Sequence, residues 1–216
     1  MSEARASDHN TIPSVHHPFF SRFFRWYAST GPARRYLEPM RSEVAGLARG
    51  VTLEIGVGSG LNFALYPPGQ VERVEAIEPD ATMLRYAEQS RQRAPVPITL
   101  TQAPAEALPF ADETFDSALA TLVFCSVSDP QRSLAEIKRV LKPGGALLLM
   151  EHVRAEGAVT ARVQDMLTPF TKLLSGGCHW NRDTAKAVAE AGFRITSVRR
   201  IWGGLQPGII IQAERP

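Results

Sequence analysis

Short apolar segments alternate with amphipathic ones along most of this chain, and this alternation constrains the fold more than any other feature. The apolar runs predict strands, and the longer segments between them, apolar on one face, predict helices. Strands that alternate with helices form a mostly parallel sheet that is covered on both faces. The predicted strands span residues 51–55, 71–77, 97–101, 115–123, 146–150, 193–201 and 208–213. The predicted helices between them span residues 80–93, 131–141, 158–175 and 182–191.

The last two predicted strands are separated by Gly203, Gly204 and Pro207. This turn predicts a hairpin, which adds an antiparallel strand at one edge of the sheet. We therefore expect an α/β fold with a doubly wound, mostly parallel sheet of seven strands whose last strand is antiparallel. Ligands of such sheets bind beyond the carboxyl ends of the strands, where the strand order reverses. The chemistry should lie just after positions 55, 77, 101 and 123.

The first 50 residues differ from the rest and divide into two parts. Residues 1–15 are polar and predict a flexible tail. Residues 16–50 predict helices that form a lid over a domain spanning residues 51–216. Within this lid, residues 18–28 carry aromatic side chains at helical spacing between arginines, so they could cover the pocket, with Tyr27 toward the substrate. The same residues could instead pack on the sheet, or make a peripheral contact with a membrane interface.

Composition and charge exclude several classes of protein. The formal net charge is +2, which is too small to indicate a nucleic-acid partner. No apolar run reaches the roughly 18 residues of a membrane span, and we expect a cytoplasmic protein without a secretory signal. The two cysteines, Cys125 and Cys178, are too few for a disulfide framework or a four-cysteine zinc site.

A glycine-rich turn follows the first predicted strand and indicates which cofactor the chain binds. Gly56, Gly58 and Gly60 let the backbone turn tightly and approach a ligand. The nicotinamide and flavin fingerprint needs its third glycine one position later, where this chain has Leu61. Glu54, just before the loop, would repel a pyrophosphate but would attract an ammonium or sulfonium group. S-adenosylmethionine carries both groups, so these residues favour it over a dinucleotide.

A second acid, Glu78, follows the second predicted strand. A carboxylate there can accept hydrogen bonds from both hydroxyls of a ribose, and it rejects a ribose with a 2′-phosphate. The structural alternative is a cap for the helix that begins near Pro79. Because Glu78 occurs together with the glycine loop, we predict that it binds the ribose.

Several motifs in the same order make the chain resemble the class I methyltransferases that use S-adenosylmethionine. The resemblance extends over residues 34–213, and its motifs are residues 53–60, 77–79, 105–110, 114–116 and 139–145. It implies a Rossmann-like fold and an enzyme that turns S-adenosylmethionine into S-adenosylhomocysteine.

The resemblance also implies which residues hold the cofactor. Many relatives have an acid where this chain has Pro104, so the adenine amino group loses a side-chain acceptor there and Glu106 would replace it. The implied contacts are Glu54, Gly56, Gly58, Ser59 and Gly60 for the methionine portion, Glu78 and Pro79 for the ribose, Ala105 and Glu106 for the adenine, and Leu122 as a packing contact.

A narrower resemblance is to the small methyltransferases that methylate alkyl thiols, through residues 62–69, 121–127, 150–153 and 177–178. It implies methyl transfer to the sulfur of a small, fairly apolar thiol. N-methylation of phosphatidylethanolamine and C-methylation of a quinone-type lipid use the same scaffold and stay open as alternatives. A cofactor-binding module without turnover is a further alternative, which the presence of both acids and all three glycines disfavours.

A thiol reacts as its thiolate, so the acceptor site needs a group that takes the proton. His152, at the end of the fifth strand, and His179, between the last two helices, are candidate catalytic bases. His152 could instead only hydrogen-bond a neighbouring loop, and the segment around His179 could cap the next helix. The residues that we expect to contact the substrate are Tyr27, Phe124, Cys125, Cys178 and Trp180.

Two cysteines and two histidines raise the question of a metal site. Zinc sites are recognised in sequences by ligand pairs such as C-x-x-C, and this sequence has none. The methylated sulfur belongs to the substrate, so neither Cys125 nor Cys178 is needed as a nucleophile. Buried free cysteines act most often as small apolar residues. The sequence therefore predicts no metal site.

Overall fold

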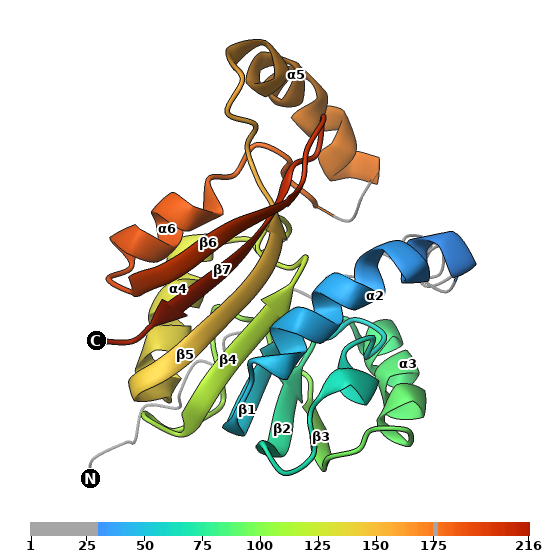
Figure 1. Ribbon diagram of the computed structural model, residues 1–216, viewed down its shortest axis with the longest axis vertical. Helices are drawn as coiled ribbons and strands as arrows, with labels where there is room; N and C mark the ends of the chain where they lie inside the picture. The colour runs from blue at the N-terminus through green and yellow to red at the C-terminus, as the bar shows by residue number, and fades with distance from the viewer. Residues whose placement is uncertain (1–29, 175–176) are drawn as a thin grey trace, which may run out of the picture.

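The computed structural model describes residues 30–174 and 177–216, so the predicted tail, the aromatic segment 18–28 and Tyr27 lie outside the described residues (Figure 1). The predicted α/β fold is confirmed: a single seven-stranded sheet has the order β3-β2-β1-β4-β5-β7-β6. Its strands are β1 (Gly50–Ile55), β2 (Val71–Ile77), β3 (Ile98–Thr101), β4 (Phe115–Thr121), β5 (Leu141–His152), β6 (Arg194–Trp202) and β7 (Gly208–Glu214).

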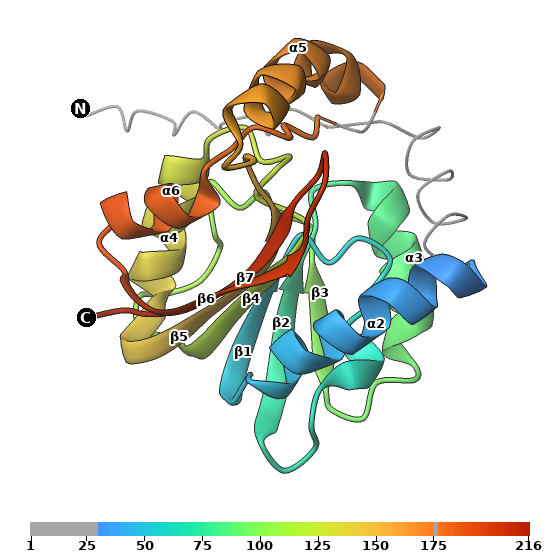
Figure 2. The same cartoon turned by 45° about the horizontal axis from the view of Figure 1, so that its top comes forward.

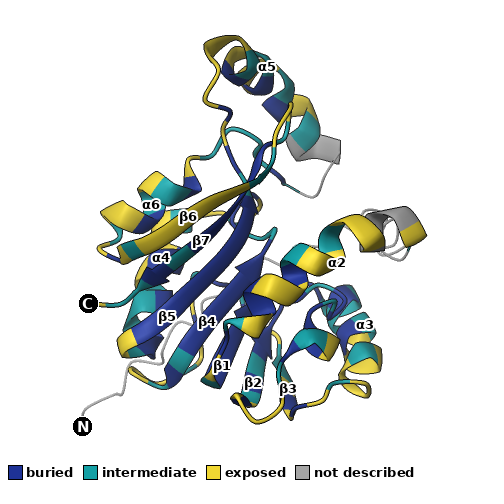
Figure 3. Cartoon of the chain, in the orientation of Figure 1, coloured by how far each residue is buried: buried dark blue, intermediate teal, exposed yellow. Residues whose placement is uncertain are grey.

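Strands β1 to β5 pair in parallel, and the predicted antiparallel last strand is confirmed as β7. Its place differs from the expectation, because β7 lies between β5 and β6 and the edge strand is β6. Burial explains the order: Ile209, Ile210 and Ile211 of β7 are buried, whereas most of β6 is exposed (Figure 3). The more apolar strand of the hairpin takes the inner position, where its side chains leave water.

Helices cover both faces of this sheet, and a further helix lies beyond the end of β5 (Figures 1 and 2). In β5, Leu147 and Leu149 join the apolar cluster of α4 and α6, and Leu148 and Met150 join the cluster of α2 and α3. Successive side chains of a strand point to opposite faces, so a strand that is covered on both sides is apolar throughout. The helices are α2 (Gly31–Gly46), α3 (Ala81–Arg91), α4 (Pro130–Val140), α5 (Ala158–Leu174) and α6 (Thr184–Glu190), with a short 3-10 helix, η1 (Phe63–Leu65).

The strand order reverses at β1, which has β2 on one side and β4 on the other. The loops after these strands meet at one end of the sheet, where α5 lies beyond the end of β5 (Figure 1). Strand β5 extends two residues past its predicted end, since Glu151 and His152 pair with Ile209 and Gly208 of β7. His152 is therefore the last residue of the strand, and this pairing fixes its backbone.

Candidate active site

The glycine loop turns sharply after β1, and its glycines have positive φ angles of 61° at Gly56, 54° at Gly58 and 77° at Gly60. A Cβ at Gly56 would lie 2.7 Å from the Val123 methyls, and one at Gly60 would lie 2.6 Å from the Phe63 ring. At Gly58, by contrast, a Cβ would meet nothing within 4 Å. The loop thus packs its outer glycines against the protein and leaves its middle glycine open to a ligand.

Glu78 connects this loop to the start of α3. Its Oε2 accepts the Gly58 N–H at 2.9 Å, and its Oε1 accepts the Asp80 N–H at 3.0 Å. Asp80 itself caps α3 by accepting the N–H groups of Thr82 and Met83, so the capping role belongs to Asp80 and not to Glu78. Burial raises the pKa of Glu78. A buried carboxylate thus lies directly behind the open part of the loop.

Glu54 lies in a buried polar network beneath the loop. Its carboxylate accepts hydrogen bonds from the Tyr66 hydroxyl at 2.6 Å and from the Asn62 amide at 2.8 Å. Arg41 of α2 donates to the Asn62 carbonyl oxygen at 3.1 Å and to the Thr121 hydroxyl at 2.5 Å. Burial raises the pKa of Glu54 to about 7, although the hydrogen bonds from Tyr66 and Asn62 and the charge of Arg41 act in the opposite direction.

Four members of this network were not identified from the sequence: Arg41, Asn62, Tyr66 and Thr121. A signal for Arg41 does exist, because it lies on the same helical stripe as the buried Val44 and Ala45, where a small apolar residue is expected. Asn62 and Tyr66 reach one carboxylate from either end of η1. No local pattern indicates Thr121, which comes from the end of β4.

The other residues expected to contact the cofactor make hydrogen bonds within the protein or are buried in it. Their contacts with the cofactor stay predictions. Ala105 is buried, and the Glu106 carboxylate accepts the N–H groups of Ser128 and Asp129 before α4. The carbonyl oxygen of Ser59 accepts the Ser90 hydroxyl, and that of Pro79 accepts the Gln102 amide.

Leu122 has an unusual backbone conformation, with a φ of 61°. Its N–H donates to the Met150 carbonyl oxygen at 2.7 Å, which holds the turn after β4 against β5. A left-handed leucine costs about 1–2 kcal/mol, and such conformations are frequent at functional sites. The predicted packing of Leu122 against the cofactor is compatible with this position but is not tested by it.

Three residues that the sequence analysis assigned to the acceptor side come together. The sulfurs of Cys125 and Cys178 and one ring nitrogen of His152 lie within 4.8 Å of one another. Both cysteines are buried free thiols. The Cys178 thiol and burial raise the pKa of Cys125, whereas the hydrogen bond with Cys125 lowers the pKa of Cys178. This cluster of three donor atoms was not predicted, because its residues do not form close ligand pairs in the sequence.

The segment between α5 and α6 completes the acceptor side. The His179 N–H donates to the Cys125 carbonyl oxygen at 2.7 Å, and Nδ1 of His179 lies 3.2 Å from the same oxygen. Arg182 donates to the Phe124 carbonyl oxygen, and Phe124 itself is buried. Asp183 caps α6 by accepting the Lys186 N–H, which is the capping role given above as the alternative for this segment. His179 thus fixes the Cys125 backbone, and its role as a base stays a prediction.

A further buried acid, Glu151, was not identified from the sequence. Its Oε1 accepts the N–H groups of Val123 and Phe124 at 2.8 and 3.0 Å, and burial raises its pKa far above the ordinary value. Its Oε2, Nδ1 of His152 and Nε1 of Trp180 are buried and lack a hydrogen-bond partner among the residues that the structure describes. The His152 ring also packs against Trp202, with 5.6 Å between ring centroids.

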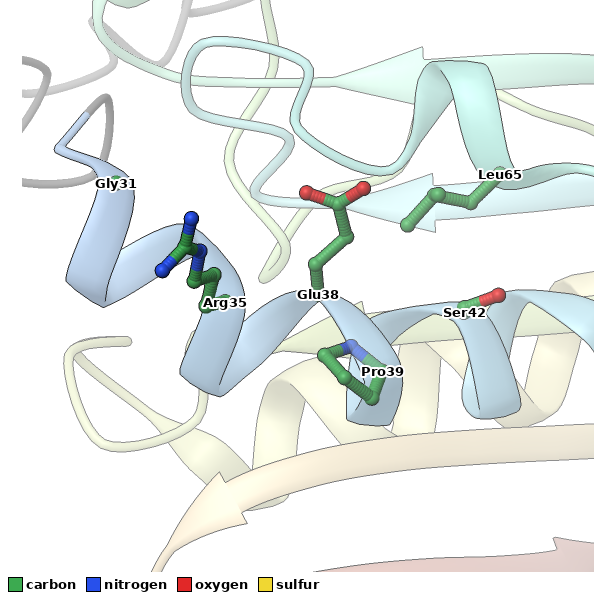
Figure 4. A pocket seen from close by; sticks show the side chains of 6 residues that line it. All are labelled: Gly31, Arg35, Glu38, Pro39, Ser42 and Leu65. Atoms are coloured by element: carbon green, nitrogen blue, oxygen red, sulfur yellow. The ribbon is translucent and has the colours of Figure 1, made fainter.

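The structure has two hollows near the site, and residues of the glycine loop line neither of them. One, of about 560 Å³, runs along α2 and is lined by Gly31, Arg35, Glu38, Pro39, Ser42 and Leu65 (Figure 4). The other, of about 210 Å³, lies between Phe124, Arg182 and the start of α6. The cofactor side is therefore predicted from the chemistry of the loop residues and not from the size of a hollow.

The structure bears on membrane contact in one respect only. Within residues 30–174 and 177–216, no helix combines the length and apolar character needed to cross a bilayer. Residues 18–28, on which the interface alternative depends, are outside this range.

The chain is similar to known proteins in sequence and in fold. Residues 53–149 match the methyltransferase domain family. Thiol S-methyltransferase TMT1B of Rattus norvegicus is 32% identical over 190 residues, which cover 82% of this chain and 77% of the relative. Phosphatidylethanolamine N-methyltransferase of Cereibacter sphaeroides is 33% identical over 153 residues, covering 70% and 72%. The crystal structure of a SAM-dependent methyltransferase of Thermotoga maritima has a TM-score of 0.65 at 25% identity, covering 91% of this chain and 98% of that one.

Proposed function

Because this chain belongs to the class I S-adenosylmethionine-dependent methyltransferases, we propose that it methylates the sulfur of a small, fairly apolar thiol by in-line displacement. The observation that carries the proposal is the similarity to a thiol S-methyltransferase over 82% of the chain. That similarity extends well beyond residues 53–149, the part that matches the general methyltransferase domain, and covers more of the chain than the 70% matched by the phosphatidylethanolamine N-methyltransferase.

The residues after β1 and β2 fit the cofactor. S-adenosylmethionine supplies a methyl group that is already activated by its attachment to a sulfonium. The open backbone at Gly58 would contact the methionine portion, and Glu78 would accept from the ribose hydroxyls. Glu54 would act mainly through its charge when ionised, because it is buried beneath the loop at 2% exposure, where Tyr66 and Asn62 donate to its carboxylate. A negative charge beneath the loop favours a cationic ligand over a pyrophosphate.

On the acceptor side, the protein has to align the sulfur with the methyl group and exclude water. Phe124, Cys125 and Cys178 supply a buried, weakly polar surface that suits a small thiol. His152 lies at this surface, at the end of β5. A histidine there can activate the acceptor in two ways: it can take the proton of the thiol, or it can bind a metal ion that stabilises the thiolate.

A screen of methyl acceptors tests the proposal, with the full chain and cofactor labelled in its methyl group. The acceptors are a short alkyl thiol, phosphatidylethanolamine in liposomes and a demethylated quinone. We expect label in the thioether of the alkyl thiol, with or without liposomes. Label in either lipid but not in the thiol would contradict the proposal and favour the function of the lipid-methylating relatives.

The screen also decides about a module without turnover. If the protein were such a module, calorimetry would show that it binds S-adenosylmethionine, but no acceptor of any class would become labelled. We expect binding together with turnover.

A further inference from the structure

The cluster of Cys125, His152 and Cys178 joins three separate parts of the chain. Cys125 lies in the loop after β4, His152 ends β5, and Cys178 lies in the segment before α6. Their donor atoms lie within 4.8 Å of one another, and both cysteine side chains are buried while His152 is partly accessible. Two sulfurs and an imidazole nitrogen therefore face one small volume.

Two thiolates and an imidazole are a ligand set that binds Zn²⁺ in enzymes with an open fourth position. In a tetrahedral site with Zn–S and Zn–N distances of about 2.3 and 2.0 Å, neighbouring ligand atoms are about 3.5–3.8 Å apart. The observed separations, at most 4.8 Å, come within about an ångström of that geometry. A bound ion would have to draw the three side chains together by about that distance.

The backbone around the cluster is firmly held. The Cys125 carbonyl oxygen accepts the His179 N–H, and Glu151 accepts the N–H groups of Val123 and Phe124 just before Cys125. The pairing of His152 with Gly208 fixes the third ligand on a strand. These contacts hold the main chain at all three ligands' elements in place, so that the side chains start from fixed positions.

The cluster also lies next to the cofactor side. Val123, two residues before Cys125, is the residue whose methyls a side chain at Gly56 would meet. The turn after β4 therefore touches the glycine loop on one side and supplies a cluster ligand on the other. An acceptor sulfur held at the cluster would lie on the side of the sheet end where the methyl group is expected.

We propose that Cys125, His152 and Cys178 bind Zn²⁺ or a similar thiophilic divalent ion, whose fourth position takes the sulfur of the acceptor. The second half of this proposal rests on the proposed thiol-methylating function, and the first half does not. On binding, the thiol loses its proton to solvent and the metal holds the thiolate. A sulfur lone pair then forms the new S–CH₃ bond. The bond from that methyl to the sulfonium breaks and leaves its electron pair on neutral S-adenosylhomocysteine. The neutral thioether product is a weaker ligand than the thiolate, and water replaces it.

Cobalt titration tests the metal site without turnover. The full chain is stripped of metal under a reductant that keeps both thiols free, and Co²⁺ is added. We expect one Co²⁺ per chain and a thiolate-to-cobalt charge-transfer band, which Zn²⁺ abolishes by displacement. Cys125→Ser and Cys178→Ser should each weaken binding by roughly 100-fold or more, beyond the loss typical of outer contacts. Ser128→Ala, at an exposed serine three positions after Cys125, is the control and should bind like the parent.

A second measurement applies if a cysteine variant does not fold. In the unchanged chain, bound Zn²⁺ should protect both thiols from a thiol-modifying reagent, and removal of the metal should expose them. The proposal is overturned if no charge-transfer band appears, if a folded cysteine variant binds Co²⁺ as tightly and with the same band as the parent, or if Zn²⁺ leaves the modification rates unchanged.

The acceptor half is tested on the cobalt-loaded chain with S-adenosylhomocysteine, so that no methyl transfer occurs. A short alkyl thiol should shift the charge-transfer band, and the alcohol of the same chain length should not. If thiols are methylated equally fast by metal-free protein, the role of the metal is overturned and the proposed function stands. If the band appears but no thiol is methylated, the metal site stands and the proposed function is wrong.

Discussion

The two sides of the site differ in how their buried polar groups are satisfied. On the cofactor side, Glu54 and Glu78 use both oxygens to accept hydrogen bonds from the protein. On the acceptor side, Glu151, His152 and Trp180 each bury a polar atom that has no hydrogen-bond partner in the described ranges, against one such atom, Nε of Arg41, in the network below the glycine loop. An unpaired buried polar atom costs about 1–3 kcal/mol. The cofactor side is therefore organised in advance, and the acceptor side has more to gain from a ligand.

The largest effect should come from the glycine loop, because its backbone packs too closely against the protein to accept a side chain at Gly56. Gly56→Ala combines a left-handed backbone with a Cβ 2.7 Å from Val123, so we expect a loss of roughly 3–5 kcal/mol in the free energy of unfolding. Urea denaturation measures this. Gly58→Ala is the control: it has the same backbone strain but open space, and it should lose only about 1 kcal/mol. Equal losses would show that the contact with Val123 does not matter.

The next effect concerns the charge of Glu54. Its pKa in the folded chain is about 7, against an ordinary value of 4.5. Between these pH values the folded state binds more protons than the unfolded state, so stability falls as the pH rises and levels off above 7. The contribution is about 3 kcal/mol over this range.

Glu54→Gln cannot ionise, and its unfolding free energy should change less between pH 5 and 8 than that of the parent. Denaturation at several pH values measures the slope, which is independent of any overall loss of stability. A variant that kept the slope of the parent would assign the titration to another group.

Glu78 should matter mainly for the cofactor. Glu78→Gln keeps the size of the side chain but removes a charge and an acceptor, so we expect the dissociation constant of S-adenosylmethionine to rise about 10- to 150-fold. Calorimetry measures it. Glu88→Gln, an exposed acid on α3, is the control and should leave the affinity unchanged. Unchanged affinity in Glu78→Gln would remove the ribose assignment.

The smallest effect should come from the acceptor side. Trp180→Phe removes the buried Nε1–H that lacks a partner in the described part of the chain. The relief of that desolvation offsets the lost ring volume, so the free energy of unfolding should change by less than about 1 kcal/mol. A loss of 2 kcal/mol or more would mean that Nε1 has a partner, and the contrast between the two sides would weaken.

The sequence was most informative where function depends on neighbours along the chain. The turn at residues 56–60, the acid after β2 and the alternation of strands and helices are local patterns, because backbone strain and strand periodicity act over a few residues. The structure places Glu54 and Glu78 beside one loop, as expected. The sequence did not indicate that Asp80 would cap α3, or that Glu106 would bind the turn before α4. A carboxylate can accept from any nearby N–H group, and which one is near depends on the packing of other elements.

The sequence by itself determined the fold class, the mostly parallel direction of the strands and the family, since each follows from periodicity and from short motifs. Only the tertiary structure decided that β7 lies between β5 and β6, and that Arg41 and Thr121 complete the network around Glu54. It also decided that Cys125, His152 and Cys178 share one small volume. The three cluster residues are 27 and 26 positions apart along the chain. Groups that far apart meet only when burial of the sheet on both faces brings the ends of different strands together.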